Sequence, residues 1–371
     1  MARIAFVADV HVGNHRLHGG PSVSGINTRC RLVLDSLAYA VSAAAAAGCD
    51  AFVVCGDLFD TVRPEPQVIR AVQDVLRCDT NMQVYLLCGN HDAASSAEGD
   101  NALAPLESHN VHVVDTPSVA KCDDVSLLLV PYNSQHPSEW LAQTVSGLAG
   151  LASGNKVAAV HLGVIDGSTP PFMRSVNDAV ELTDLVRIAA SCSVDRVYAG
   201  NWHSYRTWRV NSVTVVQCGA LAPTGHDNDW RECGKMSLYD TAPPTPGARR
   251  SAVLNVPGPR FVQARTVDDL RAEVAAAQAP GCAVYARVIV DGQNDAAKVA
   301  LSTGQVAGVT GWDARSCTKA AAAASARSRV AAAASATVQE AVANYVDSVR
   351  LEDVDKAALK ALVAAYVAKV L

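Results

Sequence analysis

Short apolar runs alternate with helix-period segments along the first two-thirds of the chain. Runs of β-branched and aliphatic residues predict strands at 4–8, 51–55, 83–88, 111–114, 126–130, 156–160 and 196–199. Apolar residues at helical spacing predict helices at 28–47, 66–77, 138–148 and 178–190. The strand runs are continuously apolar rather than alternating, which is typical of sheets that are buried on both faces. The sequence therefore predicts an α/β layered core.

The pattern changes after residue 213, where strands at 213–218 and 235–239 are joined by short turns, as if a second sheet packs on the first. The Pro/Gly-rich stretch at 241–250 then predicts a domain boundary. Beyond it, a smaller unit is predicted, with its strands at 251–256, 260–265 and 282–290 and its helices at 267–278 and 296–301. We expect one domain at 1–240 and a smaller α/β domain at 250–311.

The C-terminal part consists of an alanine-rich segment and a second apolar pattern. Residues 312–336 are predicted to be a linker, because alanine favours helix but provides little apolar bulk. Within 337–371, apolar residues at helical spacing predict two short amphipathic helices. These helices either pack on each other and on the domain, or dock into a partner protein. Periodicity alone leaves both interpretations open.

Composition and charge exclude several classes of protein. Half of the residues are apolar and 18% are charged, and 31 basic against 36 acidic residues give a net charge of −5. That balance argues against a protein that coats nucleic acid by bulk charge, although it does not exclude a local group of basic residues. The chain contains neither an apolar run of membrane-spanning length nor a signal-peptide pattern, so we expect a cytoplasmic protein without membrane contact. Eleven cysteines without a CxxC pair argue against a disulfide framework or a thiolate zinc site.

Polar residues with metal-ligand chemistry follow five of the predicted strands. They are Asp9 and His11; Asp57 and Asp60; Asn90, His91 and Asp92; His161; and Asn201 and His203. The carboxyl ends of strands in an α/β sheet share one edge, where ligand-binding crevices form. Solvated turns explain any one of these clusters but not five in succession.

The types of side chain indicate the metal. Carboxylates, amides and imidazoles without a thiolate suit Mn²⁺, Fe²⁺ or Zn²⁺ better than Ca²⁺. Six or seven ligands are too many for one ion with open positions, whereas two ions about 3.5–4 Å apart and bridged by a carboxylate use them all. Such a pair grips a phosphate and activates water for attack at phosphorus. Glycines before Asp57 and Asn90 let the backbone turn sharply, so that the next side chain faces the metals.

These motifs carry a resemblance to a known family. DxH, GDxxD, GNHD, a single His and a near-GHxH, in this order over residues 9–203, resemble the calcineurin-like metallophosphoesterase superfamily. GDLFDT followed by a proline and GNHD is similar to its SbcD-like DNA-repair nuclease branch, and GALAPTGHDND at 219–229 resembles phage members of that branch. The resemblance implies a four-layer α/β/β/α sandwich, a smaller capping domain and a C-terminal helical hairpin.

The resemblance also implies a role for each site residue. Asp9, His11 and His203 are expected to hold one metal, Asp57 to bridge, and Asn90, His161 and Asn201 to hold the second. His91 is expected to contact the phosphate and to protonate the leaving 3′-oxygen, with Asp92 orienting its ring. Asp60 is expected to support a ligand rather than to be one.

Asn201 departs from the family pattern, which has His at this position. An amide oxygen ligates more weakly than an imidazole, so the second metal site is expected to be looser. Natural variation, metal-selective tuning and a deliberately weakened, engineered protein are three competing explanations.

Substrate contacts are less sharply defined. His15, Arg16 and His18 lie in the loop at 12–27, which is expected to touch a phosphate backbone; the alternative is a mobile solvated loop. A second group consists of residues that could contact DNA but are equally well explained as surface or core residues: Arg63, Trp202, Arg206, Trp208, Arg209 and Arg231. Four histidines are interpreted as ordinary surface or loop residues: His109, His112, His136 and His226.

The sequence thus predicts a two-metal DNA nuclease subunit that uses Mn, with Mg, Fe or Zn as alternatives. By resemblance, 337–371 is expected to bind an SbcC-like coiled-coil ATPase, and segments near 64–78 and 101–107 to form a homodimer. One alternative is a calcineurin-like phosphatase or cyclic-nucleotide phosphodiesterase with the same metal core. The other is a DNA-end-binding subunit with chemistry impaired by Asn201.

Overall fold

The fold is described from a computed structural model of the whole chain. The described residues are 1–77, 81–93, 101–133, 138–174, 178–241, 251–290 and 296–316. The predicted helical hairpin at 337–371, nearly all of the predicted linker and His136 lie outside these ranges.

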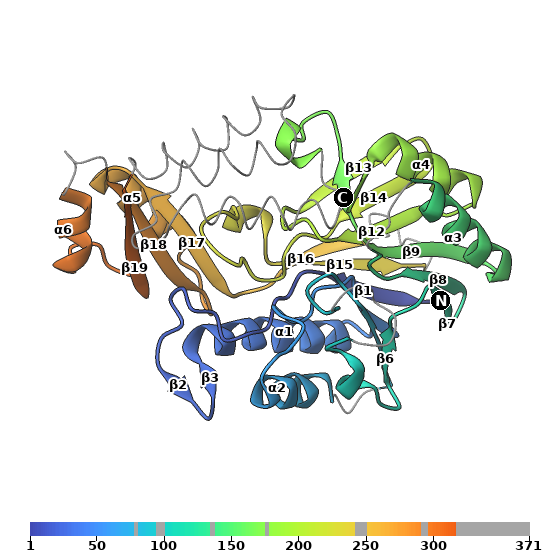
Figure 1. The fold of residues 1–371 in the computed structure, drawn as a ribbon, viewed down its shortest axis with the longest axis horizontal. Coiled ribbons are helices and arrows are strands. Elements are labelled where there is room, and N and C mark those ends of the chain that lie inside the picture. The colour runs from blue at the N-terminus through green and yellow to red at the C-terminus, as the bar shows by residue number, and fades with distance from the viewer. Residues whose placement is uncertain are drawn as a thin grey trace, which may run out of the picture.

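Two six-stranded sheets form the centre of the larger unit (Figure 1). The first sheet has the order β16 (Ser251–Asn255), β15 (Lys235–Asp240), β1 (Arg3–Val7), β4 (Ala51–Val54), β5 (Gln83–Leu87) and β6 (Val111–Val114). Its strands β1, β4, β5 and β6 are parallel, and β15 and β16 add antiparallel strands at one side.

The second sheet has the order β13 (Arg206–Val210), β14 (Val213–Gln217), β12 (Arg196–Gly200), β9 (Asn155–His161), β8 (Val125–Val130) and β7 (Ser118–Cys122). The four central strands are parallel, and β7 and β13 pair antiparallel at the two edges. Neither edge strand was predicted, because both are short and mostly half-buried or exposed and therefore lack a continuous apolar run.

The two sheets pack face to face and are covered by helices on their outer faces. Between them lies a buried cluster in which the ring of Phe6 stacks on that of Tyr198, with the ring centroids 3.7 Å apart. Helices α1 (Thr28–Ala46) and α2 (Pro66–Leu76) cover the first sheet, and α3 (Ser138–Leu151) and α4 (Leu182–Ser191) cover the second (Figure 1). The predicted four-layer α/β/β/α sandwich is therefore confirmed.

A third, three-stranded parallel sheet forms the smaller unit, called the cap below. Its strands are β17 (Pro259–Ala264), β18 (Ala283–Val290) and β19 (Gly311–Ser316), and its helices are α5 (Val267–Ala277) and α6 (Ala296–Ser302). Helix α5 begins where the Thr266 side chain accepts a hydrogen bond from the backbone N–H of Asp269. These elements enclose a separate apolar core.

The structure differs from the sequence expectation at both ends of the cap. The strand at 251–255 is β16 of the first sheet, because it pairs with β15 rather than with the strands of the cap. Strand β19 was not predicted and extends from 311 to 316, into the range predicted as a linker. Its sequence, GWDARS, has no apolar run, and its place in the sheet comes from pairing with β18.

Shorter elements lie in the connections. The predicted helix at 178–190 begins instead as strand β11 (Ala179–Glu181), which pairs with β10 (Gly163–Ile165) before α4 starts. A small ribbon of β2 (Ser22–Val23) and β3 (Ile26–Asn27) precedes α1, and 3₁₀ turns lie at 104–106, 171–173 and 230–232. Within the described ranges, no helix has the length and apolar character that crossing a membrane requires.

A buried arginine joins three segments near the start of α1. The Arg29 side chain is 1% exposed and donates hydrogen bonds to the carbonyl oxygens of Leu17, at 2.7 Å, and of Thr224. Its guanidinium lies 4.6 Å from the centroid of the Phe261 ring in β17. Burial lowers the pKa of Arg29 to about 10, which still leaves it charged at neutral pH. This one cation therefore links α1, the loop before α1, the loop after β14, and the cap.

We expect Arg29→Met to lower the free energy of unfolding by about 2–4 kcal/mol, because two buried carbonyl groups lose charged donors. Urea denaturation of the full-length protein measures the effect. The matched control is Arg31→Met, since Arg31 is exposed on the same helix, and it should change stability by less than about 0.5 kcal/mol. Equal effects of the two substitutions would contradict this role of Arg29.

Candidate metal centre

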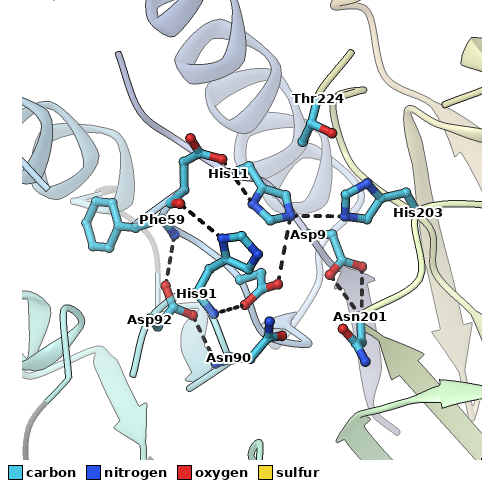
Figure 2. Close-up of polar contacts among 12 residues, drawn as sticks. Asp9, His11, Phe59, Asn90, His91, Asp92, Asn201, His203 and Thr224 are labelled. Atoms are coloured by element: carbon cyan, nitrogen blue, oxygen red, sulfur yellow. Dashed lines mark hydrogen bonds and ion pairs between the residues drawn. The ribbon is translucent and has the colours of Figure 1, made fainter. Parts of the chain in front are cut away.

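The predicted ligand residues lie at the carboxyl ends of five parallel strands. Strands β1, β4 and β5 of the first sheet lead to Asp9 and His11, to Asp57, and to Asn90. Strand β9 of the second sheet ends at His161, and β12 leads to Asn201 and His203. Figure 2 shows side chains from both sheets converging on one cluster.

The turns that follow these strands place several site residues in left-handed backbone conformations. Asp9, His11 and Asp57 have φ angles of 49°, 52° and 53°, and Asn201 has a φ of 93°. Non-glycine residues adopt this region at a cost, and such strain concentrates at functional sites. The backbone is therefore bent to aim these side chains inward.

Two glycines leave room for this arrangement, in different ways. Gly56 has a φ of 94°, and a Cβ atom there would collide with the His161 ring. Gly89 does not have a positive φ, but a Cβ atom there would collide with the Asp57 carboxylate. The sharp turn expected at both glycines is thus present at Gly56, whereas Gly89 is required for space.

Asp9, His11, His203 and Asp57 form one group of facing side chains. Potential ligand atoms of the first three all lie within 4.8 Å of one another. The Nε2 atoms of His11 and His203 are 3.1 Å apart, and His11 Nε2 lies 3.8 Å from Asp57 Oδ2. Asp60 Oδ1 lies 3.5 Å from His11 Nδ1, on the other side of the ring. Asp60 therefore lies where it can orient His11 and leave its Nε2 atom for a ligand.

Asp57 also faces a second group, which contains Asn90 and His161. The Nε2 atom of His161 lies 2.9 Å from Asn90 Oδ1 and 3.6 Å from Asp57 Oδ1. Its Nδ1 atom lies 2.8 Å from the Cys55 carbonyl oxygen, so Nδ1–H donates there and Nε2 keeps its lone pair. The two oxygens of Asp57 thus face different groups, which is the geometry that a bridging carboxylate needs.

Asn201 holds Asp9 through its backbone. The backbone N–H of Asn201 lies 2.9 and 3.1 Å from the two oxygens of the Asp9 carboxylate. Its side-chain Nδ2 donates to the Asp178 carbonyl oxygen at 3.1 Å, so Oδ1, the atom that is predicted to ligate, is on the other branch of the amide (Figure 2). The ligand role of Asn201 stays a prediction.

His91 and Asp92 do not contact each other as expected. The His91 ring lies at the exposed side of the cluster, and its Nδ1 is 3.0 Å from the carbonyl oxygen of Asp60. Asp92 is fully buried and accepts backbone N–H bonds from Leu58, Phe59 and Gly89 at 2.9–3.2 Å (Figure 2). The prediction that Asp92 orients His91 is therefore wrong, because Asp92 instead fixes the turn that carries Asp57.

The three residues predicted to touch substrate separate in the structure. His15 lies beside the cluster, with Nδ1 3.5 Å from Asp60 Oδ2. Arg16 is exposed. His18 faces away from the cluster and contacts His226 and Asp313 of the cap.

Comparison with known proteins identifies the family. The sequence profile described as calcineurin-like phosphoesterase matches residues 2–205, which is more than half of the chain. The chain belongs to this family. A search of curated proteins finds no match.

Several solved structures are similar to this chain over about two thirds of its length. A protein of Thermus thermophilus is 14% identical with a TM-score of 0.46, and the match covers 68% of this chain and 98% of that one. A dimetal phosphatase of Danio rerio is 12% identical with a TM-score of 0.42, covering 69% and 99% of the two chains. A 5′-nucleotidase of Staphylococcus aureus, named as putative, is 14% identical with a TM-score of 0.41, covering 69% and 53%.

Electrostatics explain why this calcineurin-like phosphoesterase needs cations at the cluster. Asp9, Asp57 and Asp92 are at most 1% exposed, and in the described part of the chain no lysine or arginine forms an ion pair with them. Burial, and then the neighbouring Asp57, raise the pKa of Asp9 well above its usual value and that of Asp92 to about 7. Buried carboxylates without a counter-ion are costly. Together with the imidazoles, they fit the two divalent metals that this family uses.

The pKa values of His11 and His203 are shifted in opposite directions. Burial, and then His11, lower the pKa of His203 to about 4, which keeps its ring neutral and able to ligate. Although burial opposes it, the carboxylates of Asp60, Asp57 and Asp9 raise the pKa of His11. The carboxylates thus favour positive charge at the position where the first metal is predicted.

Some contacts of the centre were missed by the sequence reasoning. The carbonyl groups of Cys55 and Asp178 orient His161 and Asn201. A sequence motif consists of side chains, so it cannot indicate a contact with a backbone carbonyl. Asn228 Oδ1 lies 3.3 Å from His203 Nδ1 and accepts from the backbone N–H of Thr224. Asn228 belongs to the 219–229 loop, and the unusual sequence of this loop is the feature that could have indicated its contact with His203.

We expect Asp57→Ala to lose both metals, because both groups of ligands share this carboxylate. Elemental analysis after gel filtration in Mn²⁺ should fall from two metals per chain to none. The control is Asp35→Ala, at an exposed position of α1, which should keep both. A variant at Asp57 that retains two metals would refute the bridging role.

Proposed function

We propose that this protein is a two-metal DNA nuclease subunit of an SbcCD-like complex, which hydrolyses phosphodiester bonds at DNA ends or hairpins with Mn²⁺. Family membership supports phosphoester hydrolysis. The observation that carries the finer proposal is the cap, a complete α/β unit that packs against the loops of the metal cluster.

The contacts of the cap are specific and come from several elements. Arg231, between β14 and β15, donates to both oxygens of Glu273 in α5, at 2.8 and 3.0 Å. Ser36 of α1 donates to the Pro257 carbonyl at 2.8 Å, and Arg29 packs on Phe261. A cap fixed in this way extends the protein surface beyond the metal cluster. An extended surface suits a polymeric substrate better than a small phosphomonoester.

A pocket beside the cluster supplies a binding surface for nucleotides. Its lining includes Asn201 and His203 at the cluster, the apolar Met173 and Trp202, and the cationic Arg206. Aromatic faces stack on bases, and arginine binds phosphate oxygens. We infer that the nucleotides next to the scissile bond bind here.

The other proposed DNA contacts divide into free and engaged side chains. The indole N–H of Trp208 donates to Asp166 Oδ2 at 2.9 Å, and Arg231 is occupied by Glu273, so neither is placed for DNA. Arg63 and Arg209 are exposed. Arg206 also has partners, since it donates to Ser168 at 2.7 Å and lies 3.9 Å from Asp166 Oδ2, but it is the one that lines the pocket beside the cluster, which makes it the best candidate for a phosphate contact.

His91 is positioned to handle the proton in this reaction. Its backbone N–H donates to Asp57 Oδ1 at 2.8 Å, and the Asp60 carbonyl receives its Nδ1–H, so that Nε2 is directed away from these anchors. Nε2 can thus protonate a leaving 3′-oxygen. Bound metals supply positive charge for the phosphate and lower the pKa of water. Asp92 contributes by holding the turn of Asp57 in place.

The proposed partners extend this assignment. We propose that 337–371, outside the described residues, binds an SbcC-like coiled-coil ATPase. We also propose a homodimer through the segments near 64–78 and 101–107. These two segments are adjacent, since Gln73 of α2 donates to the Pro105 carbonyl at 2.7 Å. Two adjacent segments can form one continuous surface, which can pair with the same surface of a second copy in a symmetric interface.

We expect His91→Ala to lower Mn²⁺-dependent cleavage of linear and hairpin DNA by a factor of about 10²–10⁴, the usual contribution of a general acid. Metal content should remain at two per chain. The control is His109→Ala, an exposed histidine, which should keep wild-type activity.

The same assay separates the rival functions. Cleavage of a small phosphodiester or a cyclic nucleotide without action on DNA would favour the phosphatase or phosphodiesterase alternative. DNA-end binding without cleavage, in a protein with two metals, would favour an end-binding subunit.

We expect Asn201→His to bind the second metal more tightly, because imidazole is a stronger ligand than an amide oxygen. Half-maximal cleavage should occur at a lower Mn²⁺ concentration than in the wild type. An unchanged Mn²⁺ dependence would show that position 201 does not ligate.

A further inference from the structure

A second cluster of potential ligands lies between the cap and the catalytic unit. It consists of His18 from the loop before α1, His226 from the loop after β14, and Asp313 from β19. His18 Nε2 lies 3.3 Å from His226 Nε2 and 3.4 Å from Asp313 Oδ2, and His226 Nε2 lies 3.9 Å from Asp313 Oδ2. His226 thus lies in a loop, as one of the two interpretations held, but it is not a surface histidine, because its side chain is 0% exposed.

Two of the three distances match the edges of a tetrahedral zinc site. Ligand atoms about 2.0–2.1 Å from zinc, at tetrahedral angles, lie about 3.3–3.4 Å from one another. Two of the three separations fall there, and the third is slightly longer. Hydrogen bonding explains only part of why these three side chains lie so close together. His18 Nε2 carries at most one hydrogen, so it cannot donate to both His226 and Asp313.

Neighbouring groups orient two of the ligands. His226 Nδ1 lies 3.1 Å from the Val262 carbonyl oxygen, so Nδ1–H donates there and the lone pair of Nε2 faces the cluster. Arg287 donates Nε–H to Asp313 Oδ1 at 2.7 Å and an N–H to Oδ2 at 2.9 Å, and each oxygen retains a further lone pair. Carbonyl groups behind histidines and donors behind carboxylates are typical surroundings of metal ligands.

The surroundings also favour neutral imidazoles. Tyr285 stacks on His18 with the ring centroids 4.9 Å apart, and Phe261 meets His226 edge-on at 5.0 Å. Burial, and then Arg287, lower the pKa of His226 to about 4, and burial also lowers the pKa of His18. Both rings are therefore uncharged at neutral pH, as ligation requires.

The ligand set selects among metals. Arg287 already balances the charge of Asp313, so the site offers two imidazole nitrogens and little net negative charge. Mg²⁺ and Ca²⁺ depend on several oxygen ligands and are disfavoured, whereas Zn²⁺ binds well to imidazole. The third protein ligand is a carboxylate oxygen, which zinc also accepts.

We propose that His18, His226 and Asp313 bind a zinc ion that fastens the cap to the catalytic unit. His18 follows His11 in the same loop, and Asn228, which contacts His203, lies two residues after His226. The site thus joins β19 to the loop that carries His11 and to the loop whose Asn228 contacts His203. This zinc is separate from the proposed catalytic pair and does not depend on the substrate.

Zinc binding is tested in a background that lacks the catalytic sites. The full-length variant Asp57→Ala with His203→Ala, stripped of metal and exposed to Zn²⁺ alone, should retain one zinc per chain after gel filtration. Addition of His18→Ala should reduce this to none, whereas addition of His109→Ala should not. Retention of no zinc by the background variant, or of one zinc despite His18→Ala, would overturn the proposal.

Spectroscopy on the background variant keeps the test independent of whether the His18 variant folds. Cobalt in place of zinc should give the visible absorption of a tetrahedral ion, and zinc X-ray absorption should indicate two imidazoles and one carboxylate. An octahedral cobalt spectrum or a different ligand set would also overturn the proposal. Circular dichroism checks that each variant is folded.

Discussion

Buried negative charge at the carboxyl ends of the strands is the constraint on which the rest of this structure depends. Asp9, Asp57 and Asp92 lie in an interior that excludes water, and the described residues give them no lysine or arginine partner. Asp92 is stabilised by three backbone N–H groups, whereas Asp9 and Asp57 each accept from one, that of Asn201 and that of His91, and otherwise face imidazoles. Such an arrangement is costly without cations and favourable with them. The strained turns at Asp9, His11 and Asp57 serve the same arrangement, because these left-handed conformations aim the ligands at one point.

Cationic side chains link the cap to this centre, beside an apolar cluster in which Phe261 and Tyr285 pack with Leu32 of α1. Arg29 holds two loop carbonyls and packs on Phe261, Arg231 pairs with Glu273, and Arg287 holds Asp313 beside His18 and His226. These contacts are directional, so they fix the angle of the cap more sharply than apolar packing alone would. The loops that they hold carry His11 and Asn228. A change in the position of the cap would therefore change the positions of the first group of metal ligands.

The sequence pattern predicted the layered α/β core and the convergence of the strand-end motifs for a common reason, whereas the four-layer arrangement was implied by the family resemblance. Continuous apolar runs mark parallel strands buried on both faces, and the carboxyl ends of parallel strands meet at one edge. Features without such a signal were missed. The edge strands β7 and β13 and the strand β19 have few buried apolar residues and depend on pairing with a neighbour. The role of Asp92 and the burial of His226 depend on backbone groups far away in the sequence, which no local pattern reports.

Position 201 illustrates how the site tolerates a departure from the pattern of the family it resembles. Its backbone N–H binds both oxygens of Asp9, and this contact does not depend on the side chain. The positive φ of 93° that aims this N–H is accessible to asparagine more readily than to most residues. The side-chain amide is anchored on the Asp178 carbonyl, and its predicted role concerns only the second metal. Replacement of an imidazole by an amide here can therefore weaken one metal site while the geometry of the other is preserved, which favours tuning of the second metal over general loss of the centre.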